Sequence, residues 1–237
     1  MSANPNVTGE RTTFVAGTRS VDGYLARPST GAVSAAIIIV HEWWGLNRHI
    51  EEIAERYAAE GFLAAAPDLY HGKSTKDAAE AGKLMSSLDQ RAALEDLNVV
   101  SNELRATSGI EAVGITGFCM GGTFALLLPC HTRLEASVPY YGDVPEDTSI
   151  LANLSCPVFF IGGEKDEWIN VAKMKRLEAA LAEHKKPGEV RIYKDAPHAF
   201  FNDTRVEVYR ETDARDAWQR TIDFFNKHLR RGQAAAV

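Results

Sequence analysis

Two kinds of hydrophobic pattern alternate along the chain. Residues 36–40 (AIIIV) are apolar at every position and mostly β-branched, which is typical of a strand buried on both faces of a largely parallel sheet. Residues 47–61 (NRHIEEIAERYAAEG) then place apolar side chains at helical spacing and end on Gly61, a helix stop signal. The pattern therefore predicts a buried strand followed by a covering helix.

The same alternation continues to the end of the chain. Further strands are predicted over residues 62–70, 111–118, 135–142, 156–163 and 189–198. Helices are predicted over residues 121–131, 170–184 and 215–229, and one helix or two over residues 74–108. Near the start, residues 12–17 and 21–28 alternate between apolar and polar positions around a polar turn, which predicts an antiparallel hairpin.

Strands that alternate with helices predict an α/β fold. Right-handed crossovers then give a mostly parallel, doubly wound sheet with helices on both faces, preceded here by the antiparallel hairpin. No repeat, linker or low-complexity segment marks a boundary, so we expect a single domain over residues 8–230. Residues 1–7 and 231–237 are expected to be flexible ends.

Composition and charge narrow the class of partner. The chain of 237 residues is 45% hydrophobic and 24% charged, with a net charge of −6 and no basic block. This argues against nucleic acid and anionic membranes as partners, and no apolar run reaches the roughly 18 residues of a membrane span. The start lacks the pattern of a secretory signal. We therefore expect a cytoplasmic monomer or small homo-oligomer that acts on a small molecule.

The cysteines do not indicate a disulfide framework or a zinc site. There are three of them, Cys119, Cys130 and Cys156, far apart in the sequence. We expect free thiols, no metal and no cofactor.

Polar residues with catalytic potential follow three of the predicted strands. Ligands of an open α/β sheet bind at the carboxyl ends of its strands, and Cys119, Asp166 and His198 occupy such positions in that chain order. The stretch GFCMGG, residues 117–122, is a cysteine version of the G-x-S-x-G nucleophile elbow. The elbow would place the thiol at the amino end of a helix, where a thiolate is favoured.

Each candidate has an alternative interpretation. Cys119 could be a small buried residue in a glycine-rich turn, and His198, next to apolar AFF, could be a core histidine. Asp166 competes with three nearby acids, Glu164, Glu167 and Asp195. The chain order cysteine, acid, histidine favours catalytic roles for Cys119 and His198. The loop that places glycines and then an acid after a buried strand favours Asp166 over its neighbours.

Five motifs in order give the chain a resemblance to a known family. HEWWGLN, APDLYHG, GFCMGG, GGEKDEW and DAPHAF together resemble the dienelactone hydrolase family of the α/β-hydrolase superfamily, from about Gly23 to Leu229. The resemblance implies the α/β-hydrolase fold and a triad of the cysteine, aspartate and histidine named above. It also implies that Glu42 modulates the nucleophile and that the backbone N–H groups of Trp43 and Met120 form the oxyanion hole.

Thiol chemistry limits the substrate. A thiolate leaves more readily than an ordinary alkoxide, so a cysteine enzyme favours lactones and esters with stabilised leaving groups, which react through a thioester acyl-enzyme. The resemblance implies carboxymethylenebutenolidase activity on dienelactone. However, Asn202 stands where the family's dienelactone enzymes carry an arginine, and a further arginine and tyrosine have no match.

Aromatic residues are the other candidates for the substrate pocket. Trp43, Trp44, Trp168 and Phe200 follow predicted strands, as Asn202 does. Such walls would suit a bulkier, less charged ester. Two alternatives remain open, a ligand-binding protein without turnover and a thiol sensor that uses Cys119.

Overall fold

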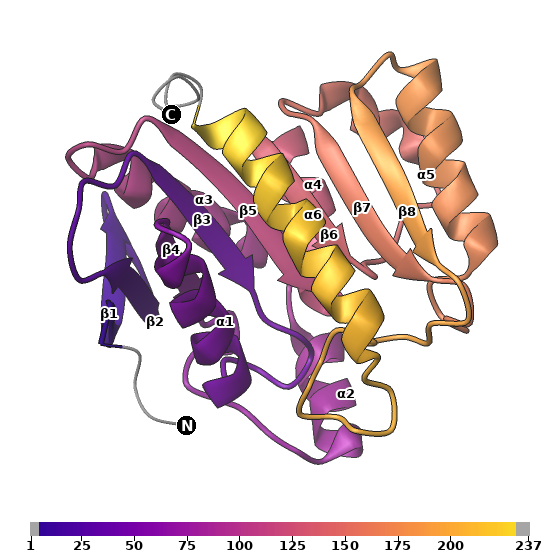
Figure 1. Cartoon of the computed structure of the whole chain (residues 1–237), viewed down its shortest axis with the longest axis horizontal. Helices are drawn as coiled ribbons and strands as arrows, with labels where there is room; N and C mark the ends of the chain where they lie inside the picture. The colour runs from indigo at the N-terminus through magenta and orange to yellow at the C-terminus, as the bar shows by residue number, and fades with distance from the viewer. Residues whose placement is uncertain (1–4, 231–237) are drawn as a thin grey trace. The chain divides into compact units, whose positions relative to one another are not determined.

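The computed structural model describes residues 5–230, and the chain divides into two units between Gly114 and Ile115. The fold class is α/β, as predicted, with mostly parallel strands, an N-terminal antiparallel hairpin and covering helices (Figure 1). Residues 1–4 and 231–237, most of the predicted flexible ends, lie outside the described residues. The single domain over residues 8–230 stays a prediction.

The first unit contains four paired strands in the order β1-β2-β4-β3. Their bounds are β1 (Val7–Ala16), β2 (Arg19–Pro28), β3 (Ala35–Val40) and β4 (Leu63–Pro67). The hairpin is antiparallel, with Val7 opposite Pro28 and Ala16 opposite Arg19. β2 also runs antiparallel to β4, whereas β3 and β4 are parallel. All six residues of β3 are buried, as its continuous apolar run predicts.

Three helices, α1 (Arg48–Ala59), α2 (Ala78–Ser87) and α3 (Gln90–Ala106), complete the first unit. The side chain of Asn47 caps α1 by accepting from the Ile50 N–H at 3.2 Å. Residues 74–108 form two helices because Leu88 is extended, and Asp89 caps α3 by accepting from Ala92 N–H at 2.8 Å.

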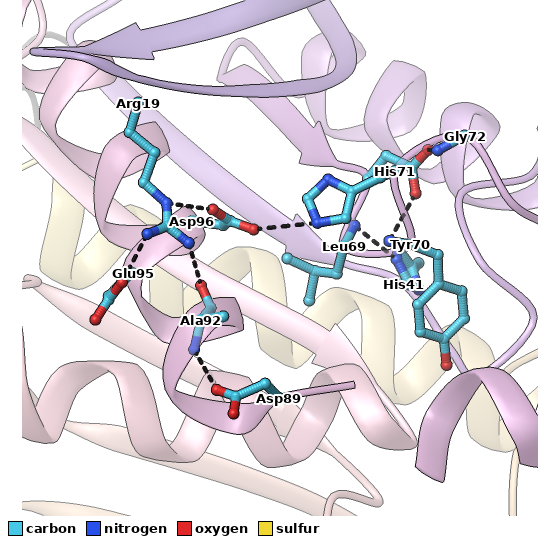
Figure 2. Close-up of polar contacts among 11 residues, drawn as sticks. Arg19, His41, Leu69, Tyr70, His71, Gly72, Asp89, Ala92, Glu95 and Asp96 are labelled. Carbon is cyan, nitrogen blue, oxygen red and sulfur yellow. Dashed lines mark hydrogen bonds and ion pairs between the residues drawn. The ribbon is translucent and has the colours of Figure 1, made fainter. Parts of the chain in front are cut away.

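A buried carboxylate joins separate parts of the first unit. Asp96 on α3 accepts a hydrogen bond from Arg19 Nε on β2 at 2.7 Å, and its second oxygen lies 3.7 Å from Nε2 of His71, in the loop after β4 (Figure 2). Arg19 also donates to Glu95 at 2.6 Å. Because Asp96 is almost inaccessible to solvent, these polar partners compensate for the burial of its carboxylate.

The second unit repeats the strand–helix alternation. Its strands are β5 (Ala112–Phe118), which spans the division, β6 (Ala136–Tyr140), β7 (Val158–Gly163) and β8 (Gly188–Tyr193), in the order β5-β6-β7-β8. Its α-helices are α4 (Met120–Leu127), α5 (Val171–Glu183) and α6 (Glu211–Leu229). β6 and β7 are parallel, as are β7 and β8. Two short 3₁₀ helices, Leu128–Cys130 and Thr148–Asn153, interrupt the pattern.

Buried apolar residues hold the helices of this unit on their strands. Met174 and Leu177 on α5 pack in one core cluster with Val158 and Phe160 of β7. The helix α6 contacts β6 and β7 and crosses in front of β6 in Figure 1. The candidate residues Cys119, Asp166 and His198 lie in the segments that follow β5, β7 and β8. Nowhere in residues 5–230 is there a helix with the length and apolar character of a membrane span.

Candidate active site

Cys119 lies on a strained turn between β5 and α4. Its φ of 54° and ψ of −117° belong to a region that residues other than glycine rarely adopt. Such a conformation costs about 1–3 kcal/mol and persists only where the surroundings impose it. Here the Cys119 N–H donates to the Tyr140 carbonyl at 3.1 Å, and the Cys119 carbonyl accepts from the Thr123 N–H at 3.2 Å. The thiol is half-buried.

Glycines make this turn possible by allowing three backbone segments to touch. A Cβ added to Gly117 would lie 2.1 Å from the Gly121 carbonyl oxygen, and one added to Gly122 would lie 2.3 Å from the Tyr140 carbonyl oxygen. The return contact is equally close, since a Cβ on Gly142 would lie 2.1 Å from Gly122. The glycines predicted for the elbow thus bring β5, α4 and the end of β6 into direct backbone contact.

We expect Gly117→Ala to destabilise the protein by about 3 kcal/mol or more, because backbone rather than a flexible side chain must move. Gly82→Ala is the matched control, since Gly82 lies within α2 and a Cβ there meets nothing within 4 Å. That control is expected to stabilise by about 0.5–1 kcal/mol through helix propensity. Urea unfolding of both variants tests the pair, and equal stabilities would contradict the close contact.

Asp166 is the acid that contacts the histidine. Its Oδ2 lies 2.6 Å from Nδ1 of His198, while its Oδ1 accepts from the N–H groups of Trp168 at 2.9 Å and Ile169 at 2.8 Å. The carboxylate is inaccessible to solvent. Three hydrogen bonds from fixed donors therefore orient it and compensate for its burial.

The competing acids are engaged elsewhere or exposed. Glu164 accepts a hydrogen bond from the N–H of Asp195 at 3.0 Å. The side chain of Asp195 lies 3.9 Å from Lys165, and Glu167 is exposed. Of the four acids considered from the sequence, Asp166 is the one for which the structure shows a bond to His198.

The His198 imidazole is held on several sides. It lies after β8 and packs against the rings of Tyr141 and Trp168, whose centroids are 5.0 and 4.9 Å from its own. With Nδ1 bonded to Asp166, the remaining nitrogen is Nε2, which is buried and forms no protein hydrogen bond of ordinary geometry within residues 5–230. Nε2 is thus the ring nitrogen available for Cys119 and for a substrate.

Burial and neighbouring polar groups shift the pKa of the His198 ring. Burial by itself would lower the pKa of His198, but the hydrogen bond to Asp166, then the interaction with the Cys119 sulfur, raise that pKa from 6.5 to about 10. The imidazolium is therefore the main form of the ring at neutral pH.

The other two thiols have a different setting. Burial raises the pKa of Cys130 to about 11 and that of Cys156 to about 12. Both thiols stay protonated and unreactive at neutral pH. Their contribution is to packing, and Cys130 belongs to the core cluster beside α5.

The first unit carries Glu42, Trp43 and Trp44 in the turn that follows β3 and His41. Glu42 is buried, and its carbonyl accepts from His41 Nδ1 at 2.6 Å and from the Gly45 N–H at 3.2 Å. The two tryptophans are half-buried and pack edge to face, with ring centroids 4.9 Å apart. This segment is therefore a tight turn with a defined backbone.

The remaining predicted residues lie in the second unit with different degrees of exposure. Met120 is buried at the first position of α4. Trp168 is 61% exposed, so that most of its ring is available to a ligand. Phe200 is fully buried against Tyr141 and Tyr193.

The side chain of Asn202, at the position of the family's arginine, forms hydrogen bonds within its own loop. Its Oδ1 accepts from the N–H of Thr204 at 3.0 Å and from the Thr204 hydroxyl at 2.6 Å. These bonds form a local turn. The Asn202 side chain is buried in that turn.

Tyr141 was missed by reasoning from the sequence. It follows β6 directly, has a φ of 38°, and packs against the His198 ring with the two ring planes tilted by 59°. The available signal was its place at a strand's carboxyl end, shared with the predicted residues. Within residues 5–230, no group of three or more His, Cys, Asp or Glu side chains could hold a metal ion.

A strained cysteine between a parallel strand and a helix, followed by an aspartate–histidine pair at later strand ends, defines the protein as an α/β-hydrolase. The chain belongs to the dienelactone hydrolase family, whose model matches residues 21–229. It is a hydrolase of the dienelactone hydrolase type.

Relatives agree with this assignment over most of their length. "Protein usf" of Aquifex pyrophilus is 39% identical over 221 residues, covering 88% of this chain and 94% of that protein. The "Putative carboxymethylenebutenolidase" of Aquifex aeolicus is 35% identical over 222 residues, covering 89% and 94%. A crystal structure named "Putative Dienelactone Hydrolase", from Klebsiella pneumoniae, superposes with a TM-score of 0.85 at 30% identity, covering 94% and 99%.

Proposed function

We propose that this protein is a cysteine-dependent hydrolase of lactones or activated carboxylic esters, acting through a thioester acyl-enzyme. The observation that carries the proposal is the 2.6 Å bond between His198 Nδ1 and Asp166 Oδ2, which leaves Nε2 for the Cys119 sulfur. The three residues are those of a nucleophile, a base and an orienting acid.

The reaction begins with attack of the Cys119 sulfur on the ester carbonyl. The tetrahedral intermediate collapses to a thioester as His198 Nε2 gives its proton to the leaving oxygen. The neutral ring then takes a proton from water, which attacks the thioester and releases the acid and the thiolate. Asp166 keeps the imidazole in one orientation and stabilises its positive charge in both steps.

Two backbone donors complete the proposed site. By the family resemblance these are the N–H groups of Trp43 and Met120, and Glu42 modulates the nucleophile. Loss of one oxyanion donor costs about 2.7–4 kcal/mol in comparable enzymes. The position of Met120 supports this role, because it directly follows Cys119 and is the first residue of α4.

The proposed substrate class follows from the leaving group and from charge. An enol lactone releases a delocalised enolate, which competes well with the thiolate, and relatives carry the name carboxymethylenebutenolidase. Asn202 is neutral and bonds within its own turn, so it offers a substrate carboxylate no positive charge at that position. The exposed ring of Trp168 beside His198 supports a bulkier, less charged ester as the alternative substrate.

We further propose a cytoplasmic location. The support is the cysteines, since Cys119, Cys130 and Cys156 are all free thiols in the structure. Free thiols of this kind suit a reducing compartment.

An acyl-enzyme burst tests the proposed function. Rapid mixing with a p-nitrophenyl ester is expected to release about one p-nitrophenolate per protein before the steady state, because acylation precedes a slower hydrolysis. Mass spectrometry of the quenched protein is expected to locate the acyl group on the peptide that contains Cys119. An acyl group on another residue, or turnover without any adduct on rapid quenching, would refute the thioester route. Binding without turnover would favour the ligand-binding alternative, and peroxide-dependent sulfenic acid without turnover would favour the sensor.

A further inference from the structure

His41 occupies a buried position that the proposed chemistry does not use. It is the first residue after β3, is completely inaccessible to solvent, and its ring centroid lies 5.0 Å from that of Tyr70. Its Nδ1 lies 2.6 Å from the carbonyl oxygen of Glu42. Its Nε2 lies 3.2 Å from the backbone nitrogen of Leu69, which Figure 2 shows beside the ring. Both ring nitrogens are therefore engaged by the backbone.

These partners determine where the proton of the ring lies. The Leu69 N–H is a donor, so Nε2 must accept with a lone pair, and Nδ1 must then carry the proton that is donated to the Glu42 oxygen. Burial lowers the pKa of His41, and the hydrogen bond to the Glu42 carbonyl and the charge of Asp68 oppose this only in part. His41 is thus neutral, in a single tautomer.

The bond to Glu42 also orients the next N–H group. The carbonyl of Glu42 and the N–H of Trp43 belong to one planar trans peptide, so they point in opposite directions. The Glu42 oxygen accepts from His41 Nδ1 and from the Gly45 N–H, which holds the plane from two sides. With that plane held, the Trp43 N–H has a defined direction.

The loop after β4, which holds the His41 ring through the Leu69 N–H, is itself fixed by hydrogen bonds. Asp68, the residue directly after β4, accepts from the N–H of Tyr70 at 3.0 Å and from that of Gly72 at 2.7 Å. Its own N–H donates to the Asp22 carbonyl at 2.8 Å. Figure 2 shows Leu69, Tyr70 and Gly72 in this loop beside His41. The Leu69 N–H that fixes the imidazole is therefore held in place by the loop around Asp68.

We propose that His41 is a positioning residue for the oxyanion hole, holding the Glu42–Trp43 peptide so that the Trp43 N–H is ready to donate to the oxyanion. The inference rests on the proposed function, because it needs the Trp43 N–H as a donor. Its effect lies in the transition state, where negative charge develops on the substrate oxygen, and not in ground-state binding.

Two variants separate this role from a merely structural one. In His41→Asn the side-chain amide can donate from the place of Nδ1 to Glu42, but nothing accepts from Leu69. In His41→Gln the longer side chain can accept from Leu69, but the donor to Glu42 is lost. Each variant loses one hydrogen bond of a buried group, so we expect similar losses of thermal stability.

The kinetics of the two variants are expected to differ. For a p-nitrophenyl ester, His41→Gln should lower kcat by about 10- to 100-fold with KM changed by less than about twofold. The reason is that a misdirected Trp43 N–H stabilises the oxyanion less well, although it is not removed entirely. His41→Asn should keep kcat within about threefold of the wild-type value. Equal losses of kcat in both folded variants, or an unchanged kcat in folded His41→Gln, would overturn the inference alone.

A measurement on the unaltered protein keeps the inference testable if the glutamine variant does not fold. Nitrogen-15 NMR of histidine-labelled protein should show His41 neutral, with the proton on Nδ1. A proton on Nε2 would overturn the inference, as would a kcat more than about tenfold below wild type in folded His41→Asn. A wild-type protein that hydrolyses no ester would refute the proposed function together with this inference.

Discussion

Replacing Cys119 with alanine is expected to lower kcat for an activated aryl ester by about 10⁴-fold or more, because removal of a nucleophile leaves only the catalysis due to binding and the oxyanion donors. The fold should be kept, since the strained turn is imposed by backbone contacts of Gly117 and Gly122 and not by the thiol. Steady-state kinetics and circular dichroism of the purified variant provide the measurement.

Cys156→Ala is the matched control for this experiment. It removes a thiol whose burial raises its pKa to about 12, far from any role as a nucleophile at neutral pH. Its kcat is expected to stay within about twofold of wild type, with a modest loss of stability from the small cavity. Activity that survives in Cys119→Ala, or that disappears equally in Cys156→Ala, would refute Cys119 as the nucleophile.

Asp166→Asn is expected to lower kcat by about 10³- to 10⁴-fold, although the amide has nearly the same shape. The amide oxygen can still accept from Trp168 and Ile169, but the NH₂ group then faces His198 Nδ1. The proton of the neutral ring must then lie on Nε2, so Nε2 can no longer accept a proton. The negative charge that stabilises the imidazolium is also lost. Steady-state kinetics with the same ester test the change in kcat.

The neighbouring acids provide controls for the aspartate. Glu164→Gln and Asp195→Asn alter carboxylates that have other partners or lie at the surface, and each is expected to change kcat by less than about threefold. A greater loss in either variant than in Asp166→Asn would move the orienting role to that residue.

The pH dependence of stability gives Asp166→Asn a second readout. Since the folded pKa of His198, about 10, lies above its ordinary value of 6.5, protonation of this ring stabilises the folded state fully below about pH 6.5. The stabilisation is lost as the pH rises toward about 10. Because Asp166 is the main group that raises this pKa, the loss of unfolding free energy in Asp166→Asn should be larger near pH 6 than near pH 10. A difference that is constant with pH would contradict the charged pair.

Much of the fold could be predicted because single segments carry their own signals. The uninterrupted apolar run of β3 indicated burial on both faces, and Gly61 indicated the end of α1. The sequence did not decide between one helix and two over residues 74–108. The break between α2 and α3 depends on a single extended residue, Leu88, which precedes the capping residue Asp89. β1 begins at Val7, earlier than the predicted hairpin, because its register with β2 extends to Pro28.

The site was predictable only in its outline. The cysteine has a local signature, since the glycines around it are demanded by backbone contact. The sequence favoured Asp166 only through its place in a glycine loop after a strand, because the choice among the acids depends on which carboxylate faces His198 Nδ1 in space. Tyr141 and the tautomer of His41 depend in the same way on partners from other strands.

The backbone contacts at the nucleophile turn have a consequence for laboratory evolution. At Gly117, Gly122 and Gly142 there is no space for even a methyl group, so randomising these codons would mainly yield proteins that do not fold. Trp168 is different, because the residue is 61% exposed while its ring packs edge to face with the imidazole. A library intended to change the accepted acyl or leaving group should therefore diversify Trp168 and leave the glycine turn as it is.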